Sequence, residues 1–393
     1  GGEMSASAAE VAGKLGVDVF HWREPWTWFH LVGTNVSADE ELVILQEQAA
    51  GRRPGGHGTF QYCGAPPEEG AKAALNSYVM NDEGKLERNT HTYECWSLPM
   101  NLDPDLPKPN RAGLALDWQF RYISRWKDPA FRGPKNFAWD SLDDWSGFRR
   151  LNFRREHFRV SALPLTFDPA SGELCQVVGF QDWSFARHHA TMICQAGGLV
   201  MANINLEHAM MFCGQWVDVS VQERAVKDYG EERLSVMRML ARAKPISFLG
   251  AFGSTEPRDV EAGLRKLLIF GIAPGSAKEE YERPLYKKYM PVLARVAAAG
   301  WEPVTHARAG GLWVERFGSA PGPIFFTVGN RTAAGVRAAV AIDTKALRLP
   351  AGAGEVKMEE VLEGRVVTLR QGPGRLEAEV DIAAGETLVL SIR

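Results

Sequence analysis

The chain lacks the features that mark several large classes of protein. No run of about 18 apolar residues occurs, so no membrane-spanning helix is predicted. The net charge is −3, the isoelectric point is near 6.4 and no basic block stands out, so neither nucleic acid nor a membrane is an expected partner. The glycine-rich G-x-G-x-x-G and P-loop patterns and the G-x-S-x-G elbow are missing. The sequence therefore predicts no nucleotide cofactor, and no cofactor of another kind is expected.

Cysteine is sparse, and its spacing excludes two further classes. The five cysteines are odd in number and show no C-x-x-C pair, which favours reduced thiols over a disulfide framework or a zinc site. No signal peptide is recognisable before the helical pattern that begins at Ala6, so the compartment stays unassigned. This abrupt start suggests that an upstream part is missing.

What the chain does contain is a regular alternation of short apolar runs and amphipathic helices, which is typical of βα units in a parallel sheet. Helices are expected near 38–49, 110–126, 182–196, 231–243, 257–267 and 282–299. The fold class is therefore α/β, a (β/α)8 TIM-type barrel, although seven predicted strands leave one missing. The missing strand is expected upstream of Gly1, in the segment 64–108, or from a second polypeptide that completes the barrel. The seven predicted strands are Val17–His21, Thr59–Cys63, Asn136–Asp140, Leu199–Ile204, Trp216–Val221, Ile246–Ala251 and about Leu268–Ile272.

After about Thr305 the pattern changes to short strands separated by Gly, Pro and Asn turns. These strands predict an all-β module, most simply a sandwich. We therefore expect a barrel domain over residues 1–305 and a C-terminal β-sandwich domain over 306–393. The expected strands are Gly311–Phe317, Ile324–Val328, Ala338–Asp343, Val356–Leu362, Val366–Leu369, Leu376–Ile382 and Thr387–Ile392.

The predicted strand Asn136–Asp140 runs directly into a carboxylate. Strands of a (β/α) barrel deliver their last residues to the catalytic face, so Asp140 is a candidate catalytic residue. Trp139 and Trp145 offer flat apolar surfaces of the kind that stack on sugar rings. Asp143 is a candidate for substrate binding, with capping of the next helix as an equal alternative.

Polar and aromatic residues also follow the other predicted strands. Two acids near the sixth strand, Glu223 and Asp218, compete as the partner of Asp140; their odd spacing places them on opposite sides of an unbroken strand. Glu223 is preferred because it falls at the carboxyl end, and Asp218 could instead be a buried acid paired with an arginine. The further candidates for substrate binding are His21, Trp22, Glu24, Trp26, Tyr62, Asn203 and Asn205.

For several other polar residues a structural role is expected more than a functional one. His188 and His189 lie within a helical pattern and are expected to be packing or surface residues and not metal ligands. Asp182 is expected to cap the helix that follows it. His157 either contacts a substrate or belongs to a solvated charged surface. No metal site is predicted.

Several stretches resemble a known group of proteins. The sequence W-D-S at Trp139–Ser141, a later acid near a strand end and a closing β-module resemble retaining glycoside hydrolases of the α-galactosidase superfamily. Short phrases resemble uncharacterised bacterial barrel glycosidase-like proteins, over roughly residues 17–393. The resemblance implies a nucleophile after the fourth strand, Asp140, and an acid/base after the sixth, Glu223 or Asp218. These phrases are LNFRREHF from Leu151, PLTFD from Pro164, KPISFL from Lys244, YERPLYKKY from Tyr281 and GWEPVT from Gly300.

The sequence thus favours a glycosidase that cleaves an oligo- or polysaccharide with two carboxylates, by a retaining mechanism. A barrel that binds carbohydrate without cleaving it is one alternative. A polysaccharide lyase or another hydrolase on the same fold is a second, because fold does not determine the reaction. The pKa values of the two acids and their separation discriminate between catalysis and binding.

Overall fold

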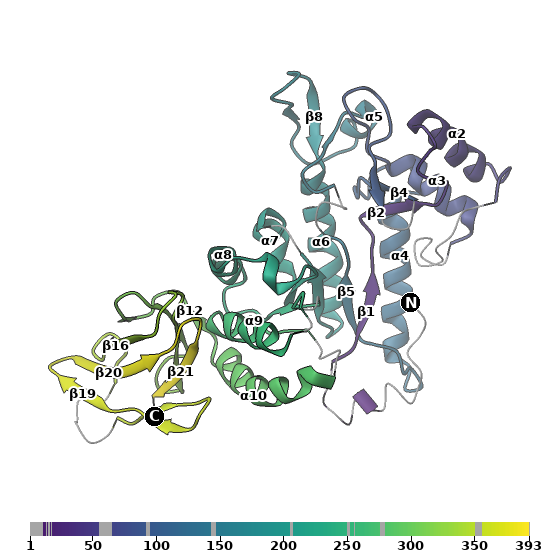
Figure 1. Cartoon of the computed structure of the whole chain (residues 1–393). Helices are drawn as coiled ribbons and strands as arrows, with labels where there is room; N and C mark the ends of the chain where they lie inside the picture. Colours follow the sequence, from purple (N-terminus) through teal and green to yellow (C-terminus); the bar gives the residue numbers. More distant parts are fainter. Residues whose placement is uncertain are drawn as a thin grey trace. The chain divides into compact units, whose positions relative to one another are not determined.

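The computed structural model describes residues 11, 12, 14, 16, 18–54, 65–91, 95–142, 147–204, 207–249, 252–254, 256–275, 280–349 and 356–392. The chain forms two compact units, Gly1–Asp218 and Val219–Arg393, which we call the first and second unit (Figure 1). The predicted domain boundary at 305/306 stays a prediction. No described helix combines the length and the apolar character needed to cross a membrane.

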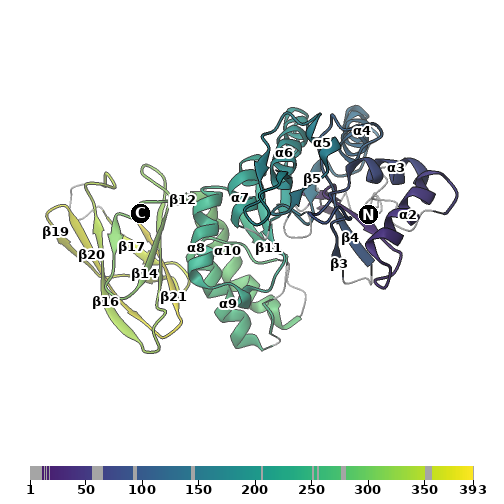
Figure 2. The ribbon, with the colours of Figure 1, turned by 90° about the horizontal axis from the view of Figure 1, so that it is seen from above.

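A parallel sheet is the centre of the first unit. Its strands are β1 (Phe20–Arg23), β5 (Asn136–Trp139) and β9 (Val200–Asn203), and β5 lies between the other two. Helices α4 (Arg111–Ser124) and α6 (Val178–Gln195) lie on the same side of β5 (Figure 2). The three strands confirm the predicted positions to within about three residues.

Local sequence explains where several helices begin. Ser37 and Glu40 form a capping box before α2 (Ala38–Ala49), in which each side chain accepts from the other residue's backbone N–H. Asn110 accepts from the Gly113 N–H and caps α4. The cap predicted at Asp182 is wrong, because α6 already begins at Val178 and Asp182 lies one turn inside it.

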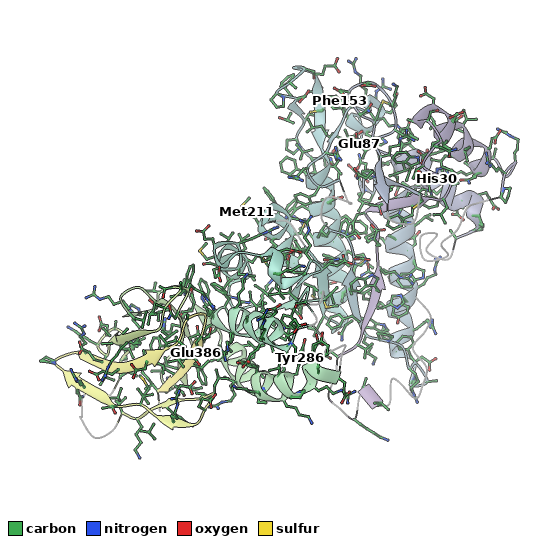
Figure 3. The ribbon with its side chains drawn as sticks, viewed as in Figure 1. His30, Glu87, Phe153, Met211, Tyr286 and Glu386 are labelled. Carbon is green, nitrogen blue, oxygen red and sulfur yellow. The ribbon has the colours of Figure 1, made fainter. Side chains whose placement is uncertain are left out.

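The remainder of the first unit adds two small antiparallel sheets. The first contains β2 (Thr27–His30), β4 (Cys95–Pro99) and β3 (Asn89–His91), beside α2 and α3 (Pro67–Ser77). His30, labelled in Figure 3, is buried with its ring nitrogens 3.0 Å from Glu41 Oε1 and 3.1 Å from Gln48 Oε1. The second contains β6 (Leu151–Asn152), β8 (Leu174–Val177) and β7 (Thr166–Phe167). The short helices of the unit are η1 (Arg125–Lys127) before this sheet, α5 (Arg155–Phe158) between β6 and β7, and α7 (Glu207–Cys213) and η2 (Gly214–Trp216) after it.

A buried polar network joins the second small sheet to the end of β4. The side chain of His157 is 1% exposed, and its Nε2 lies 3.0 Å from the Asn76 carbonyl, which can only accept. Nε2 therefore carries the proton, and Nδ1 accepts from the amides of Asn101 (3.1 Å) and Asn152 (3.0 Å). Both amides also donate to Gln176 Oε1. His157 is thus a structural residue, and neither the solvated surface nor the substrate contact considered for it is found.

The second unit begins with two parallel strands, three α-helices and two short 3-10 helices among its described residues. Strands β10 (Val219–Gln222) and β11 (Ile246–Phe248) pair in parallel, and Ser247 forms a single parallel bridge to Ala273. The strand predicted at Leu268–Ile272 is wrong in its first part, because α9 continues to Ile269. The helices are η3 (Val226–Asp228), α8 (Glu231–Ala241), α9 (Pro257–Ile269), η4 (Glu280–Glu282) and α10 (Arg283–Ala299).

Two antiparallel sheets follow, as the sequence predicts for the all-β part. The larger sheet has the order β12 (Trp301–Glu302), β14 (Trp313–Phe317), β15 (Ile324–Gly329), β21 (Thr387–Ile392), β17 (Met358–Glu360) and β18 (Arg365–Val366). The smaller sheet has the order β13 (Ala307–Arg308), β16 (Val336–Asp343), β20 (Arg375–Ile382) and β19 (Leu369–Gly372). Side chains of both sheets, among them Phe326, Val340 and Leu390, form one buried core.

The larger sheet is covered on both faces. Ile324, Phe326 and Val328 belong to the core shared with the smaller sheet. The alternate residue Thr327 donates to the Ile269 carbonyl of α9, so the opposite face of β15 meets that helix. Every residue of β15 and β21 is consequently buried, and most of them are apolar.

The described residues contain no closed barrel. They show α/β architecture with parallel strands in each unit and an all-β part at the end. The predicted strand Thr59–Cys63 lies outside the described residues, so the complete (β/α) barrel stays a prediction.

Candidate functional site

The register of the parallel sheet decides which side chains can meet. Phe137 pairs with His21 and Val200, and Ala138 pairs with Trp22 and Met201. Side chains alternate along a strand, so His21, Phe137 and Trp139 face α4 and α6, whereas Trp22 points to the other face. By the same alternation Asp140 and Asn203 share the face of Trp22.

Three of the predicted residues come together at the carboxyl ends of these strands. Trp22 Nε1 donates to Asp140 Oδ2 at 2.8 Å, and Asn203 Nδ2 donates to Asp140 Oδ1 at 3.1 Å. Each oxygen of the carboxylate is thereby held by one N–H donor from a neighbouring strand. Asn203 is fully buried, Asp140 is partly exposed and the Trp22 side chain is 38% exposed. The site therefore presents an oriented carboxylate beside an accessible indole.

The backbone around this carboxylate is fixed by the sheet and by one arginine. The Asp140 N–H donates to the Arg23 carbonyl at 2.7 Å, which extends the ladder one residue beyond β5. Ser141 then turns the chain away with a φ of +56°, a value that residues other than glycine seldom adopt. Arg111, 1% exposed at the start of α4, donates to the carbonyls of Glu24 and Pro25 and holds the loop after β1.

The residues that face the helices form an aromatic core. His21 is 9% exposed and stacks on Trp118 and Tyr122 of α4, with ring centroids 5.1 and 4.7 Å away. Burial lowers its pKa to about 3, so the imidazole is neutral. The substrate contact predicted for His21 is not found, because its strand position directs the ring into this core.

Trp26 and Trp139 belong to the same core. Both are fully buried, and their rings meet edge to face with centroids 5.6 Å apart. Trp139 Nε1 donates to His189 Nδ1 at 2.9 Å. In this structure neither indole has an exposed face for a sugar, and of the described candidates only Trp22 offers one. His189 is a packing residue, as predicted, and burial lowers its pKa to about 3.

Two buried acids lie beneath the site. Asp182 of α6 is fully buried, and neither of its carboxyl oxygens has a hydrogen-bond partner. Burial and, second, the charge of Glu24 raise its pKa well above 3.8, which favours the protonated form. Glu24, predicted to bind substrate, is 5% exposed and accepts from Thr27 Oγ1 at 2.5 Å. Glu24 thus holds the loop after β1 through Thr27, and neither acid is a surface group.

The two candidates for the second carboxyl group differ in position. Asp218 Oδ2 accepts the Val200 N–H at 2.8 Å, and its own N–H donates to the Val200 carbonyl at 2.7 Å. Val200 begins β9, and Asn203, which donates to Asp140, ends it. At 3.3 Å per residue these two ends of the strand are about 10 Å apart. Asp218 therefore caps the amino-terminal end of the strand, away from Asp140, which counts against its catalytic role. Glu223 follows β10 in the second unit and is exposed.

Four further candidates, Tyr62, Asp143, Trp145 and Asn205, lie outside the described residues. Within the described ranges no group of three or more His, Cys, Asp or Glu side chains could hold a metal ion. The sequence reasoning missed the support that Arg111 gives to the loop after β1, and the complete burial of Asp182. Asp182 shares an i, i+3, i+4, i+7 stripe with Phe185, Ala186 and His189, and this pattern was the available signal.

No protein-family model matches the chain, and no curated protein matches it by sequence. The chain is similar in structure to α-galactosidase I from Mortierella vinacea, with 9% identity, a TM-score of 0.36, and coverage of 54% of this chain and 63% of that one. It is also similar to a GH27 β-L-arabinopyranosidase from Geobacillus stearothermophilus, with 10% identity, a TM-score of 0.45, and coverage of 100% and 77%.

A third similar structure is a glycoside hydrolase family 30 xylanase from Clostridium acetobutylicum, with 8% identity, a TM-score of 0.26, and coverage of 70% of this chain and 92% of that one. Of the α-galactosidase from Mortierella vinacea the chain covers 63%, which is less than two thirds of its length. The similarity to α-galactosidase-like glycoside hydrolases that the sequence indicates is found again among solved structures.

Proposed function

We propose that the chain is a glycoside hydrolase in which Asp140 is the nucleophile. One observation carries the proposal: a partly exposed carboxylate at a strand end is held through both oxygens by Trp22 and Asn203. A nucleophile must be aimed at the anomeric carbon, and two N–H donors from neighbouring strands fix its orientation. Each carboxylate oxygen keeps a further lone pair for bond formation.

The surroundings of Asp140 suit a sugar. The indole of Trp22 is 38% exposed and its N–H reaches the carboxylate, so a ring stacked on its face would lie next to the nucleophile. Attack by Asp140 would form a glycosyl ester while an acid protonates the leaving oxygen. Glu223 is the proposed acid/base, first donating this proton and then taking one from water. A retaining mechanism requires the two carboxyl groups about 5–5.5 Å apart.

Hydrolysis of a panel of aryl glycosides and polysaccharides tests the proposal. Asp140→Asn and Glu223→Gln are compared with the wild type, and Asp117→Asn and Glu232→Gln serve as controls at exposed acids of α4 and α8. Loss of kcat/KM by about 10³-fold in both test variants, with the controls unchanged, supports both roles.

Azide separates a catalytic role of Asp140 from a structural one. Azide can replace a missing carboxylate nucleophile in Asp140→Gly and yield a glycosyl azide of inverted configuration, which a merely misfolded variant would not form. Full activity of Asp140→Asn would overturn the assignment. Binding of a saccharide by the wild type without any cleavage would support the carbohydrate-binding alternative.

A further inference from the structure

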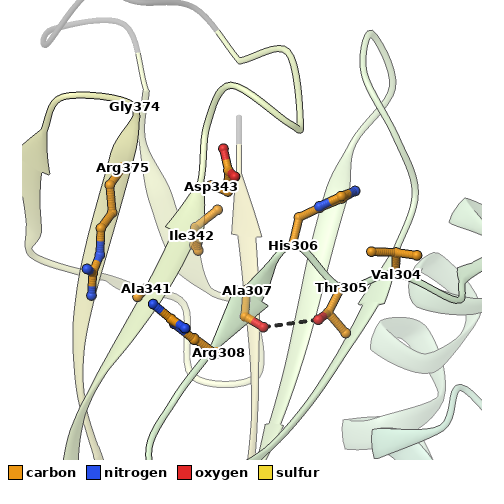
Figure 4. Close-up of a pocket in the computed structure, with 10 residues that line it drawn as sticks. All are labelled: Val304, Thr305, His306, Ala307, Arg308, Ala341, Ile342, Asp343, Gly374 and Arg375. Atoms are coloured by element: carbon orange, nitrogen blue, oxygen red, sulfur yellow. Dashed lines mark hydrogen bonds between the residues drawn. The ribbon is translucent and has the colours of Figure 1, made fainter.

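A cavity of about 460 Å³ lies on the smaller sheet of the second unit, far along the sequence from Asp140 (Figure 4). This volume is in the range of small-molecule sites. Its walls come from the segment around β13, the end of β16 and the turn before β20. The ten lining residues are Val304, Thr305, His306, Ala307, Arg308, Ala341, Ile342, Asp343, Gly374 and Arg375.

The register of the sheet explains the opening. Ala341 pairs with Arg308 on one side and with Glu377 on the other, and Asp343 pairs with Arg375. These residues share the outer face of the sheet, because the alternate residue Ile342 belongs to the core. The methyl group of Ala341 is short compared with the side chains around it, which leaves a hollow. The guanidinium groups of Arg308 and Arg375 lie on either side of Ala341 in Figure 4.

Arg308 differs from the other arginines of this face. Arg337 and Arg370 both form ion pairs with Glu379, and Arg375 reaches Glu377 at 2.8 Å. Arg308 makes neither an ion pair nor a side-chain hydrogen bond with any residue in the described parts of the chain. Its five N–H donors are open to a ligand, and Arg375 uses only part of its own. The cavity therefore has an unmatched positive charge at one end.

Two further polar groups of the lining, Thr305 and Asp343, can accept hydrogen bonds. Thr305 Oγ1 donates its proton to the Ala307 carbonyl at 3.0 Å, which leaves its lone pairs for a donor. One carboxylate oxygen of Asp343 accepts the Ala346 N–H at 2.9 Å, and the second oxygen takes no part in that bond. The Asp343 carboxylate makes the pocket less favourable for a bare inorganic anion than for a ligand that also donates hydrogen bonds. A ligand with a carboxylate and several hydroxyls would use both the arginines and the acceptors.

The backbone of this wall is also unusual. His306 has a φ of +51°, and a non-glycine residue in this region costs about 1 kcal/mol or more. The His306 carbonyl accepts the Asp343 N–H at 2.9 Å, so this conformation joins the wall to the end of β16. Such local strain clusters at ligand sites.

We propose that this cavity binds an acidic saccharide, with Arg308 and Arg375 pairing with its carboxylate and Asp343 and Thr305 accepting from its hydroxyls. Among the described residues that line the cavity there is no Trp, Tyr or Phe, so recognition is polar and depends on the carboxylate. The proposal concerns the second unit alone and does not depend on hydrolysis at Asp140.

Calorimetric titration of the full chain carrying Asp140→Asn tests the proposal without interference from cleavage. The probes are trimers of galacturonate and of glucuronate, the corresponding neutral trimers, and inorganic sulfate. Arg308→Ala is compared with Arg337→Ala, a matched control on the same face whose guanidinium is paired and outside the lining.

We expect an acidic trimer to bind, its Kd to rise by about tenfold or more in Arg308→Ala and to stay within twofold in Arg337→Ala, because charge-assisted hydrogen bonds carry this energy. The Kd should also rise with salt. Equal binding of neutral trimers, binding of sulfate alone, or an unchanged Kd in Arg308→Ala would each overturn the proposal. Loss of hydrolysis by Asp140→Asn bears only on the proposed active site, so the two failures are distinguishable.

Discussion

Acidification should destabilise the first unit through its buried histidines. His21, His157 and His189 are all buried in this unit, and burial lowers the pKa of each from 6.5 to about 3. Between these values the unfolded chain binds a proton at each imidazole and the folded chain does not. The free energy of unfolding must therefore fall as the pH decreases below 6.5.

The magnitude follows from the shift. Going from pH 7.5 to 5.5 takes the unfolded imidazole one unit below its pKa of 6.5, which removes about 1.4 kcal/mol of stability for each histidine. The three together remove about 4 kcal/mol, a large part of the stability of a typical domain. Asp182 acts in the opposite direction, because its raised pKa makes the folded state the better proton binder.

A single variant isolates one contribution from this sum. His157→Gln removes a titrating group, so its stability difference between pH 7.5 and 5.5 should be about 1.4 kcal/mol smaller than that of the wild type. Urea unfolding followed by tryptophan fluorescence measures this quantity, since all twelve tryptophans except Trp301 and Trp313 lie in the first unit.

The control is His188→Gln, at an exposed histidine of α6. It should leave the difference between the two pH values unchanged. An equal pH dependence in wild type and His157→Gln would refute the reasoning, because it would mean that the imidazole is not kept neutral by the fold.

Three further predictions concern single positions. Trp22→Phe keeps the ring and loses the N–H to Asp140, and kcat/KM on a hydrolysed glycoside should fall about tenfold or more; an unchanged value would exclude this bond from catalysis. Asp182→Asn should raise the Tm, more at pH 8 than at pH 5. The cost of keeping the buried carboxyl group protonated increases with pH, and an amide does not titrate; an equal effect at both pH values would contradict this. Gly318→Ala should lower the Tm far more than Gly364→Ala, because both have positive φ but a Cβ at Gly318 would lie 2.1 Å from a backbone oxygen; equal losses would exclude the clash.

The sequence predicted the elements well because periodicity reports local structure. The helices α2, α4, α8, α9 and α10 lie where their amphipathic patterns indicate. The strand-end argument also selected Asp140, Trp22 and Asn203, which the structure brings together. These residues share one sheet face, so the rule that polar groups gather at carboxyl ends was sufficient.

The rest of the site could not be predicted because it depends on register. His21 and Trp22 are adjacent in the sequence, but pairing with Phe137 and Ala138 directs them to opposite faces. Asp218 was placed inside a strand that in fact begins at Val219, after the short helix Gly214–Trp216, so its carboxylate lies at the other end of β9. A shift of one residue turns every side chain of a strand to the other face, so a small error in its position is enough to reverse such an assignment.

The doubly covered larger sheet has a consequence for how this chain can change in evolution. Phe325 lies beneath the guanidinium of Arg295 on α10, and Thr327 and Thr387 donate to carbonyls of α9. The helices and the sheet are therefore expected to be inherited together. Recombination that separated residues 306–393 from α9 and α10 would expose the apolar side chains of this sheet face to water. Exchange of this module between proteins is therefore expected to carry both helices with it, or to require polar replacements across the exposed face.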